Sequence, residues 1–144
     1  MSTTLTPSEL RLQDIALAFS RHGGLLTAED LLTQLRPRMS QPLSWIARRI
    51  ASREILSFTS RHAIWIPRFQ FADETRLELR PAVARVASEM IGIRQDWEIV
   101  SWFIERNERL GGLLPIDLLE TRAERVIGAA SDEAAQAPEP GAVL

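Results

Sequence analysis

The sequence contains no cysteine, no tyrosine and no lysine. The absence of cysteine excludes disulfides, thiolate metal ligands and cysteine nucleophiles. Because all 17 basic residues are arginine, a Schiff-base lysine and the lysine of a phosphate-binding loop are also excluded. Histidine occurs only at His22 and His62, and neither has a second ligand at a useful spacing. We therefore expect neither a metal site nor a cofactor.

Long apolar runs are absent as well. No run approaches the roughly 20 residues that a membrane-spanning helix needs. The first seven residues lack the basic region and apolar stretch of a signal peptide, so we expect a soluble, cytoplasmic protein. No serine lies in a nucleophile elbow, and no glycine-rich phosphate loop follows a predicted strand. The acidic residues fit helix caps or solvated helix faces, so we do not expect an enzyme.

Charge is distributed unevenly along the 144 residues, which suffice for one compact domain or two very small ones. Residues 1–68 carry nine arginines and five acids, a formal charge of +4. Residues 69–144 carry eight arginines and fourteen acids, a formal charge of −6. This asymmetry favours a basic, nucleic-acid-binding face on the N-terminal half, although arginines on a merely solvated surface would give the same pattern.

Capping and stop signals predict three helices in this half. Thr6 and Glu9 form a capping box around Pro7, and Gly23 and Gly24 end the first helix. Thr27 begins the second helix, which ends near Leu35 because Pro37 follows. Ser40 opens the third helix. Apolar residues at helical spacing predict its buried face, which comprises Leu43, Ile46, Ala47 and Ile50.

The opposite face of the third helix carries Gln41, Trp45, Arg48, Arg49 and Ser52. Two short helices joined by a short turn fit a helix-turn-helix, in which the N-terminal part of the second helix meets base edges. Arginine and glutamine have the donor geometry for guanine and adenine edges. Trp45 fits this role less well, and we favour core packing or a protein interface for it over stacking on a base.

A β-hairpin follows the third helix, because Ile55–Phe58 and Ala63–Pro67 are rich in β-branched and aromatic residues around a polar turn. Three helices followed by a hairpin is the order of a winged helix, which we assign to residues 1–72. Arg61 and His62 fall at the wing tip, where cations meet phosphate, although His62 also fits a plain turn residue. The predicted DNA-binding residues are Gln41, Ser44, Arg48, Arg49, Arg61 and His62.

The C-terminal half predicts a small helical module at residues 73–130, so the fold class is mainly α. In the segment before this module, Phe69 and Phe71 occupy alternate positions, as in a strand. This segment either extends the hairpin or joins the two modules. One helix begins at Pro81, a second is capped by Asp96 and ends at Asn107, and two more cover 113–119 and 123–130. Residues 131–144 show no periodicity and predict a disordered acidic tail, either a plug that orders on a partner or a solubilising end.

Residues Trp102–Asn107, Leu110–Gly112, Pro115–Leu119 and Val126 resemble the toxin-binding domain of Xre/MbcA/ParS-type antitoxins. The shared pattern is a tryptophan-bearing helix, an asparagine, a leucine-glycine turn, a proline with a leucine pair, and a valine in the last helix. The resemblance covers roughly residues 74–130.

This resemblance implies that the protein binds and neutralises a RES-type, NAD-consuming toxin. It also implies that the protein binds operator DNA to regulate its own operon. We expect a homodimer. The implied partner-binding residues are Trp102, Asn107, Leu110, Gly112, Pro115 and Leu119. The alternative is a winged-helix transcriptional regulator or dimeric adaptor without a toxin partner. In that case Trp97 and Trp102 belong to a core, and Gly111, Gly112 and Pro115 shape a turn.

Overall fold

The structure is a computed structural model that describes residues 7–73 and 78–137, with side chains described at residues 12–73 and 80–137. It is mainly helical, with 58% helix and 13% strand, as the sequence predicts. None of the described helices combines the length and apolar character needed to cross a bilayer. The chain divides into two compact units, residues 1–70 and 71–144.

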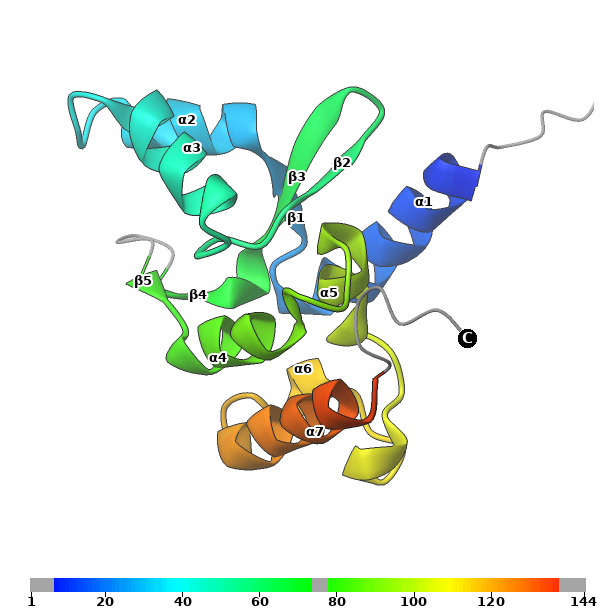
Figure 1. The fold of residues 1–144 in the computed structure, drawn as a ribbon. Coiled ribbons are helices and arrows are strands. Elements are labelled where there is room, and N and C mark those ends of the chain that lie inside the picture. The colour runs from blue at the N-terminus through cyan, green and yellow to red at the C-terminus, as the bar shows by residue number, and fades with distance from the viewer. Residues whose placement is uncertain (1–6, 74–77, 138–144) are drawn as a thin grey trace, which may run out of the picture. The chain divides into compact units, whose positions relative to one another are not determined.

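The first unit contains three α-helices and a three-stranded antiparallel sheet (Figure 1). Its elements are α1 (Pro7–Phe19), η1 (Ser20–His22), β1 (Leu25–Thr27), α2 (Ala28–Leu35), α3 (Pro42–Ala51), β2 (Phe58–Ser60), β3 (Ala63–Pro67) and η2 (Arg68–Gln70). The three predicted helices are confirmed. The predicted hairpin is present, but its first strand is Phe58–Ser60 rather than Ile55–Phe58. The short strand β1 is not predicted from the sequence.

The helix boundaries follow from local chemistry. Gly23, with φ 93°, ends the first helical segment in a left-handed conformation that glycine adopts readily. At the start of α2 the Asp30 backbone N–H donates to Thr27 Oγ1 at 3.0 Å, and the Thr27 N–H donates to Asp30 Oδ2 at 3.2 Å. The predicted cap at Thr6 lies outside the described residues.

The sheet has the strand order β1-β3-β2, so the last strand lies in the middle. Leu26 of β1 is opposite Ile66, and Phe58 of β2 is opposite Trp65. Leu26, Ile66 and Phe58 are all buried, which fixes the register because a one-residue slip would expose them.

A buried aromatic pair and a buried amide hold the end of this unit. Phe69 stacks on Phe19 with ring centroids 5.2 Å apart. Gln70 is fully buried; its Oε1 accepts from the Leu56 N–H at 2.7 Å, and its Nε2 donates to the carbonyls of Leu56 and Pro67, each at 2.9 Å. Phe69 therefore belongs to the core of the first unit, and neither it nor Phe71 extends the hairpin.

The predicted buried face of α3 is wrong at two of its four positions. Ile46 is buried and Ile50 is half-buried, but Leu43 is 67% exposed and Ala47 is exposed. The helix is rotated so that Trp45 is half-buried, with the Arg49 guanidinium over its ring at 4.4 Å. A tryptophan ring buries more apolar area than a leucine, which explains the rotation.

The second unit is helical apart from one two-stranded pairing. Its elements are β4 (Phe71–Asp73), β5 (Glu78–Leu79), α4 (Pro81–Met90), α5 (Asp96–Trp102), η3 (Glu108–Leu110), α6 (Pro115–Leu118) and α7 (Ala123–Gln136). Helix α4 begins at Pro81 as predicted. Helix α5 is capped by Gln95 rather than Asp96, and it ends at Trp102 rather than at Asn107.

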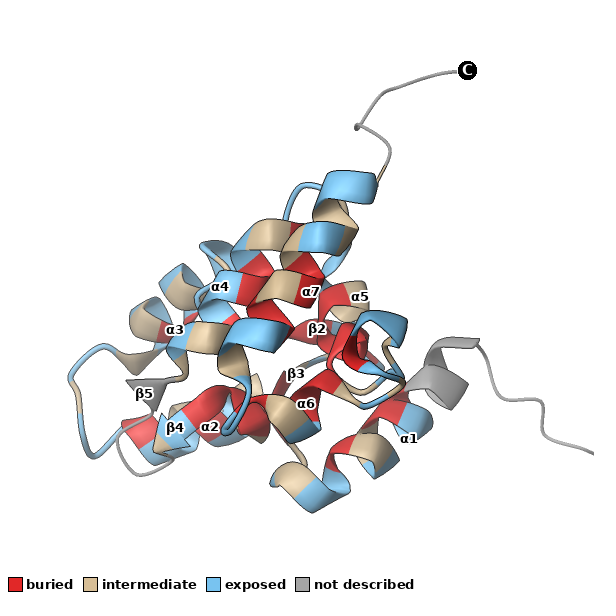
Figure 2. Cartoon of the chain, turned by 90° about the horizontal axis from the view of Figure 1, so that it is seen from below, coloured by how far each residue is buried: buried red, intermediate tan, exposed pale blue. Residues whose placement is uncertain are grey.

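Helices α4 and α7 pack against each other and contribute about half of the buried apolar residues of this unit. The predicted apolar face of α4 is buried at all four positions, Val83, Val86, Ala87 and Met90. Figure 2 shows buried and exposed residues alternating along α7. Because α7 continues to Gln136, the prediction of a disordered tail is wrong for residues 131–136, while residues 138–144 lie outside the described residues.

Candidate functional site

The solvent-facing side of α3 is the first candidate surface. Gln41, which precedes α3, shares one helical face with Ser44 and Arg48, and all three are exposed. Small side chains, Ala47 and Ala51, are exposed beside them. Among the described residues Arg48 has no ion-pair partner. This face can approach another surface closely and present one free guanidinium to it.

Arg49 is held differently from its neighbour. Its guanidinium lies over the Trp45 ring at 4.4 Å, and Nη1 is 3.6 Å from Glu54 Oε2. These two contacts turn Arg49 along the surface of its own unit. The two adjacent arginines that the sequence groups together therefore separate into one free cation, Arg48, and one tethered cation.

The tip of the β2–β3 hairpin is the second candidate surface. Ser60 pairs with Ala63, so Arg61 and His62 form a two-residue loop. Both side chains are exposed, and both backbones are left-handed, with φ 53° and 62°. Trp65 Nε1 donates to the Ser60 carbonyl at 3.0 Å and ties the base of this loop to β3. The structure thus places both predicted wing residues at the tip.

The predicted partner-binding residues of the second unit are mostly buried. Trp102 is 6% exposed, Leu110 1% and Leu119 6%, and Pro115 is buried too. Trp102 packs edge-on against Phe103, with ring centroids 5.2 Å apart. These side chains support the surrounding loop from inside rather than forming an outer surface.

Asn107 and Gly112 shape that loop. Asn107 Oδ1 accepts from the Arg109 N–H at 2.9 Å, and the Asn107 carbonyl accepts from the Gly112 N–H at 2.8 Å. Gly112 has φ 82°. The loop presents Leu113, which is 52% exposed and which is not among the predicted partner-binding residues. An exposed apolar residue next to two glycines is the signal that could have found it.

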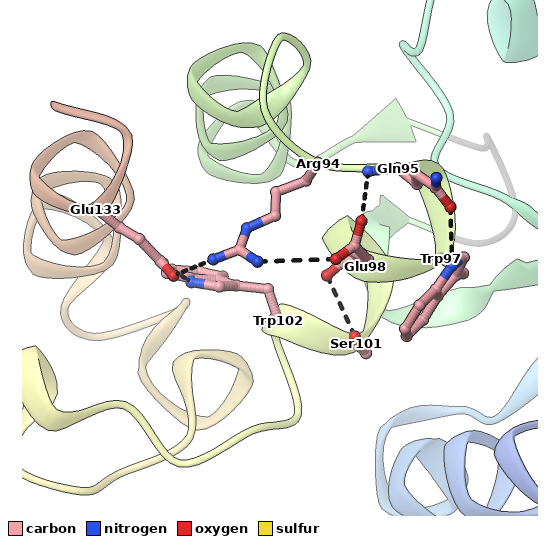
Figure 3. A network of polar contacts seen from close by, with 7 residues as sticks. All are labelled: Arg94, Gln95, Trp97, Glu98, Ser101, Trp102 and Glu133. Atoms are coloured by element: carbon pink, nitrogen blue, oxygen red, sulfur yellow. Dashed lines mark hydrogen bonds and ion pairs between the residues drawn. The ribbon is translucent and has the colours of Figure 1, made fainter. Parts of the chain in front are cut away.

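Glu133 is the centre of a polar network in the second unit (Figure 3). It accepts hydrogen bonds from Trp102 Nε1 and from Arg94 Nη2, the latter at 2.7 Å. Arg94 Nη1 is 3.7 Å from Glu98, whose side chain also caps α5 by accepting from the Gln95 N–H at 3.0 Å. The network joins α7 to α5 and to the turn before it.

A shallow pocket of about 570 Å³ lies beside this network. Arg94, Arg109, Glu133 and Gln136 line it. Arg94 is paired with Glu133, and Arg109 donates to the Gln136 side chain, so the polar groups of the pocket already bind one another. Among the described residues no group of three His, Cys, Asp or Glu side chains is placed to hold a metal ion.

Comparisons with protein-family models, with curated proteins and with solved structures find no match to this chain.

Proposed function

We propose that the first unit is a winged-helix DNA-binding domain and that the protein acts as a transcriptional regulator. The order α1-β1-α2-α3-β2-β3 and the central position of β3 in the sheet support this arrangement. Strand β1 strengthens it, because it closes the hairpin into a three-stranded sheet beside the helices. In this proposal α3 is the recognition helix and the hairpin is the wing.

The exposed face of α3 is the observation that carries the proposal. Arg48 can donate two hydrogen bonds to a guanine edge, and Gln41 can pair with an adenine edge. Alanine methyl groups such as that of Ala47 make apolar contact with thymine methyls. The exposed side of α3 thus combines one free arginine with Gln41, Ser44 and Ala47, and it also carries Leu43, which is 67% exposed. Polar donors beside apolar side chains suit the base edges and thymine methyls of a major groove.

The test is binding to a pool of random-sequence duplexes over a range of salt concentrations. The wild-type protein is expected to select sites containing guanine, with an affinity that falls as salt rises, because each neutralised phosphate contributes about −0.9 to the log–log slope. Arg48→Ala is expected to lose about tenfold in affinity and its preference at one base pair, because a bidentate contact contributes about 1–3 kcal/mol. Its melting temperature should not change.

Arg49→Ala is the matched control, since it removes an equal charge at the neighbouring position. It is expected to lower stability by about 1 kcal/mol, through the lost Trp45 contact, while base preference is kept. No duplex binding by the wild-type protein at low salt, or equal binding by Arg48→Ala, contradicts the proposal.

A second candidate function, neutralisation of a toxin, is favoured by the exposed Leu113 on the loop that Asn107 and Gly112 shape. The resemblance to antitoxins points to a RES-type, NAD-consuming toxin encoded by the neighbouring gene. Co-expression of both genes should yield a complex, and Leu113→Ser should weaken it without unfolding the protein. A harmless neighbour that does not copurify contradicts this candidate.

A further inference from the structure

The pocket beside the Glu133 network lies where three segments of the second unit meet. Its polar lining comes from the turn after α4 (Arg94), from η3 (Arg109) and from the last turns of α7 (Glu133 and Gln136). Its volume of about 570 Å³ is within the range of pockets that hold small organic molecules. The pocket can therefore hold a ligand, and the charges that line it indicate which kind.

This pocket is positively charged within an otherwise acidic unit. Residues 69–144 carry a formal charge of −6, yet two arginines and one glutamate line the pocket and give it a formal charge of +1. Both oxygens of the glutamate, Glu133, already have a donor: Oε1 accepts from Arg94 Nη2, and Oε2 accepts from Trp102 Nε1 (Figure 3). The one carboxylate of the pocket therefore neutralises Arg94 and leaves the charge of Arg109 uncompensated.

Arg109 is bound only to a neutral group. Its Nη2 donates to Gln136 Oε1, and it forms no ion pair with any residue that the structure describes. A guanidinium has several N–H donors in a planar fork, so most of the donors of Arg109 have no acceptor there. The Nε2 group of Gln136 also has no acceptor in the described part of the chain. Two unused donor groups, from η3 and from α7, thus line the same pocket.

The backbone of η3 holds Arg109 in place. Its N–H donates to Asn107 Oδ1 at 2.9 Å, and Gly111 ends the short helix with a left-handed φ of 69°. The neighbouring side chain, Leu110, is 1% exposed and anchors the segment in the core. A binding group on an ordered backbone loses less conformational entropy when a ligand binds. The cation is therefore presented to the pocket without a flexible loop having to order first.

We propose that this pocket binds a small carboxylate with a short apolar chain. The planar guanidinium of Arg109 matches a carboxylate in a bidentate arrangement. The Gln136 amide adds a neutral donor, and Ile93, which is half-buried and lines the pocket, gives the chain an apolar wall. The site uses no residue of α3 or of the β2–β3 hairpin, so it is independent of the proposed function.

The test is a titration of the 144-residue chain with sodium butyrate, with sodium chloride at equal ionic strength as the reference. The Nε–Hε signal of Arg109 in heteronuclear NMR spectra should shift saturably with butyrate and stay in place with chloride. The melting temperature should rise with butyrate, because a ligand that binds only the folded chain stabilises it. Inorganic phosphate, an oxyanion without an apolar chain, should bind more weakly than butyrate.

Arg109→Gln removes the charge and the fork but keeps a polar side chain. It should weaken butyrate binding about tenfold, the loss expected for a hydrogen bond between charged groups. Because Arg109 is exposed, the melting temperature without ligand should not change. Arg106→Gln is the matched control, since Arg106 is also exposed and lies three residues earlier but does not line the pocket. It removes the same charge and should leave butyrate binding unchanged.

Absence of a butyrate-specific shift of the Arg109 signal overturns the inference. Equal weakening by Arg109→Gln and Arg106→Gln also overturns it, because butyrate then responds to net charge and not to the pocket. Phosphate that binds more tightly than butyrate overturns the assignment to a carboxylate with an apolar chain. None of these measurements involves DNA, so each outcome leaves the proposed function to its own duplex-binding test.

Discussion

The two units differ in whether their unusual residues face solvent. In the first unit the non-glycine left-handed residues are basic, and the hairpin pair Arg61 and His62 is exposed. In the second unit the described left-handed residues are both glycines, and the motif residues Trp102, Leu110 and Leu119 are buried. The exposed pair at the hairpin tip is therefore not explained by burial in a core. Features that are buried and satisfied are explained by the fold itself.

Each unit also depends on one side chain that joins distant segments. In the first unit the Gln70 amide bridges to Leu56 and Pro67. In the second unit Glu133 receives the Trp102 and Arg94 donors. Gln70 is fully buried, whereas the Glu133 side chain is 22% exposed. Water can replace part of what Glu133 provides, so we expect the first unit to be more sensitive to loss of its central polar residue.

Gln70→Leu should give the largest effect. It keeps the volume but leaves one buried N–H and two buried carbonyls without their side-chain partner. Each unsatisfied group costs about 1–3 kcal/mol, so the expected loss is about 3–5 kcal/mol. Urea unfolding followed by tryptophan fluorescence measures it, and hydrogen exchange of peptides from residues 55–70 locates it.

Gln34→Leu is the control for Gln70→Leu, because Gln34 is exposed on α2. A surface change of this kind should alter stability by no more than about 0.5 kcal/mol. If Gln70→Leu and Gln34→Leu change the free energy of unfolding equally, the buried amide contributes no more to stability than an exposed one. That result would contradict the expectation that the first unit is the more sensitive to loss of its central polar residue.

Removal of residues 131–144 should give the next largest effect. It deletes residues 131–136 of α7, more than one and a half turns of that helix, and leaves Trp102 Nε1 and the Arg94 guanidinium without Glu133. The expected loss is about 2–4 kcal/mol, from the unpaired groups and the shortened helix. Thermal unfolding measures it.

Removal of residues 138–144 is the comparison for that truncation, because it keeps every contact described for α7. Its melting temperature should equal that of the full chain. If the longer truncation is equally harmless, Glu133 does not stabilise the second unit.

The sequence predicts most helices because their signals are local. Pro81, Thr27 and the spacing of Val83, Val86 and Met90 depend only on neighbouring residues. The end of α7 is harder to predict, because the acidic composition of residues 131–144 indicates disorder. Ala134 and Ala135 nevertheless favour helix, and the first proline comes only at Pro138. Strand β1 escapes prediction because three residues between two helices carry no readable alternation.

The candidate sites depend on tertiary contacts that spacing alone does not reveal. The rotation of α3 depends on how the whole helix packs in its unit, because Leu43 fits the apolar spacing and is nevertheless 67% exposed. The link from Glu133 to Trp102 spans 31 residues. The sequence predicts the place of the hairpin tip but not the left-handed backbone of Arg61 and His62, because neither residue is typical of that conformation.

Gly112→Ala and Gly128→Ala compare two glycines of the second unit. Gly112 has φ 82°, whereas Gly128 lies within α7, and neither has an atom within 4 Å of an added Cβ. Gly112→Ala should lose about 1–2 kcal/mol from left-handed strain, and Gly128→Ala should gain about 0.5–1 kcal/mol from helix propensity. Chemical denaturation measures both. If Gly112→Ala leaves the free energy of unfolding unchanged, as a harmless substitution would, then the Gly111–Gly112 turn does not require a glycine at position 112.

The smallest predicted effects come from one serine in each unit. Ser60 and Ser101 are both 8% exposed, but Ser101 Oγ donates to the Glu98 carbonyl at 3.2 Å, whereas Ser60 Oγ has no hydrogen-bond partner among the described residues. Ser101→Ala should lose about 1 kcal/mol, and Ser60→Ala should be neutral or slightly stabilising, because a buried hydroxyl without a partner has lost its hydration and gained no hydrogen bond. Paired urea titrations resolve this difference. A clear loss for Ser60→Ala would show that its hydroxyl has a partner in solution, and would place a further polar contact at the base of the Arg61–His62 turn.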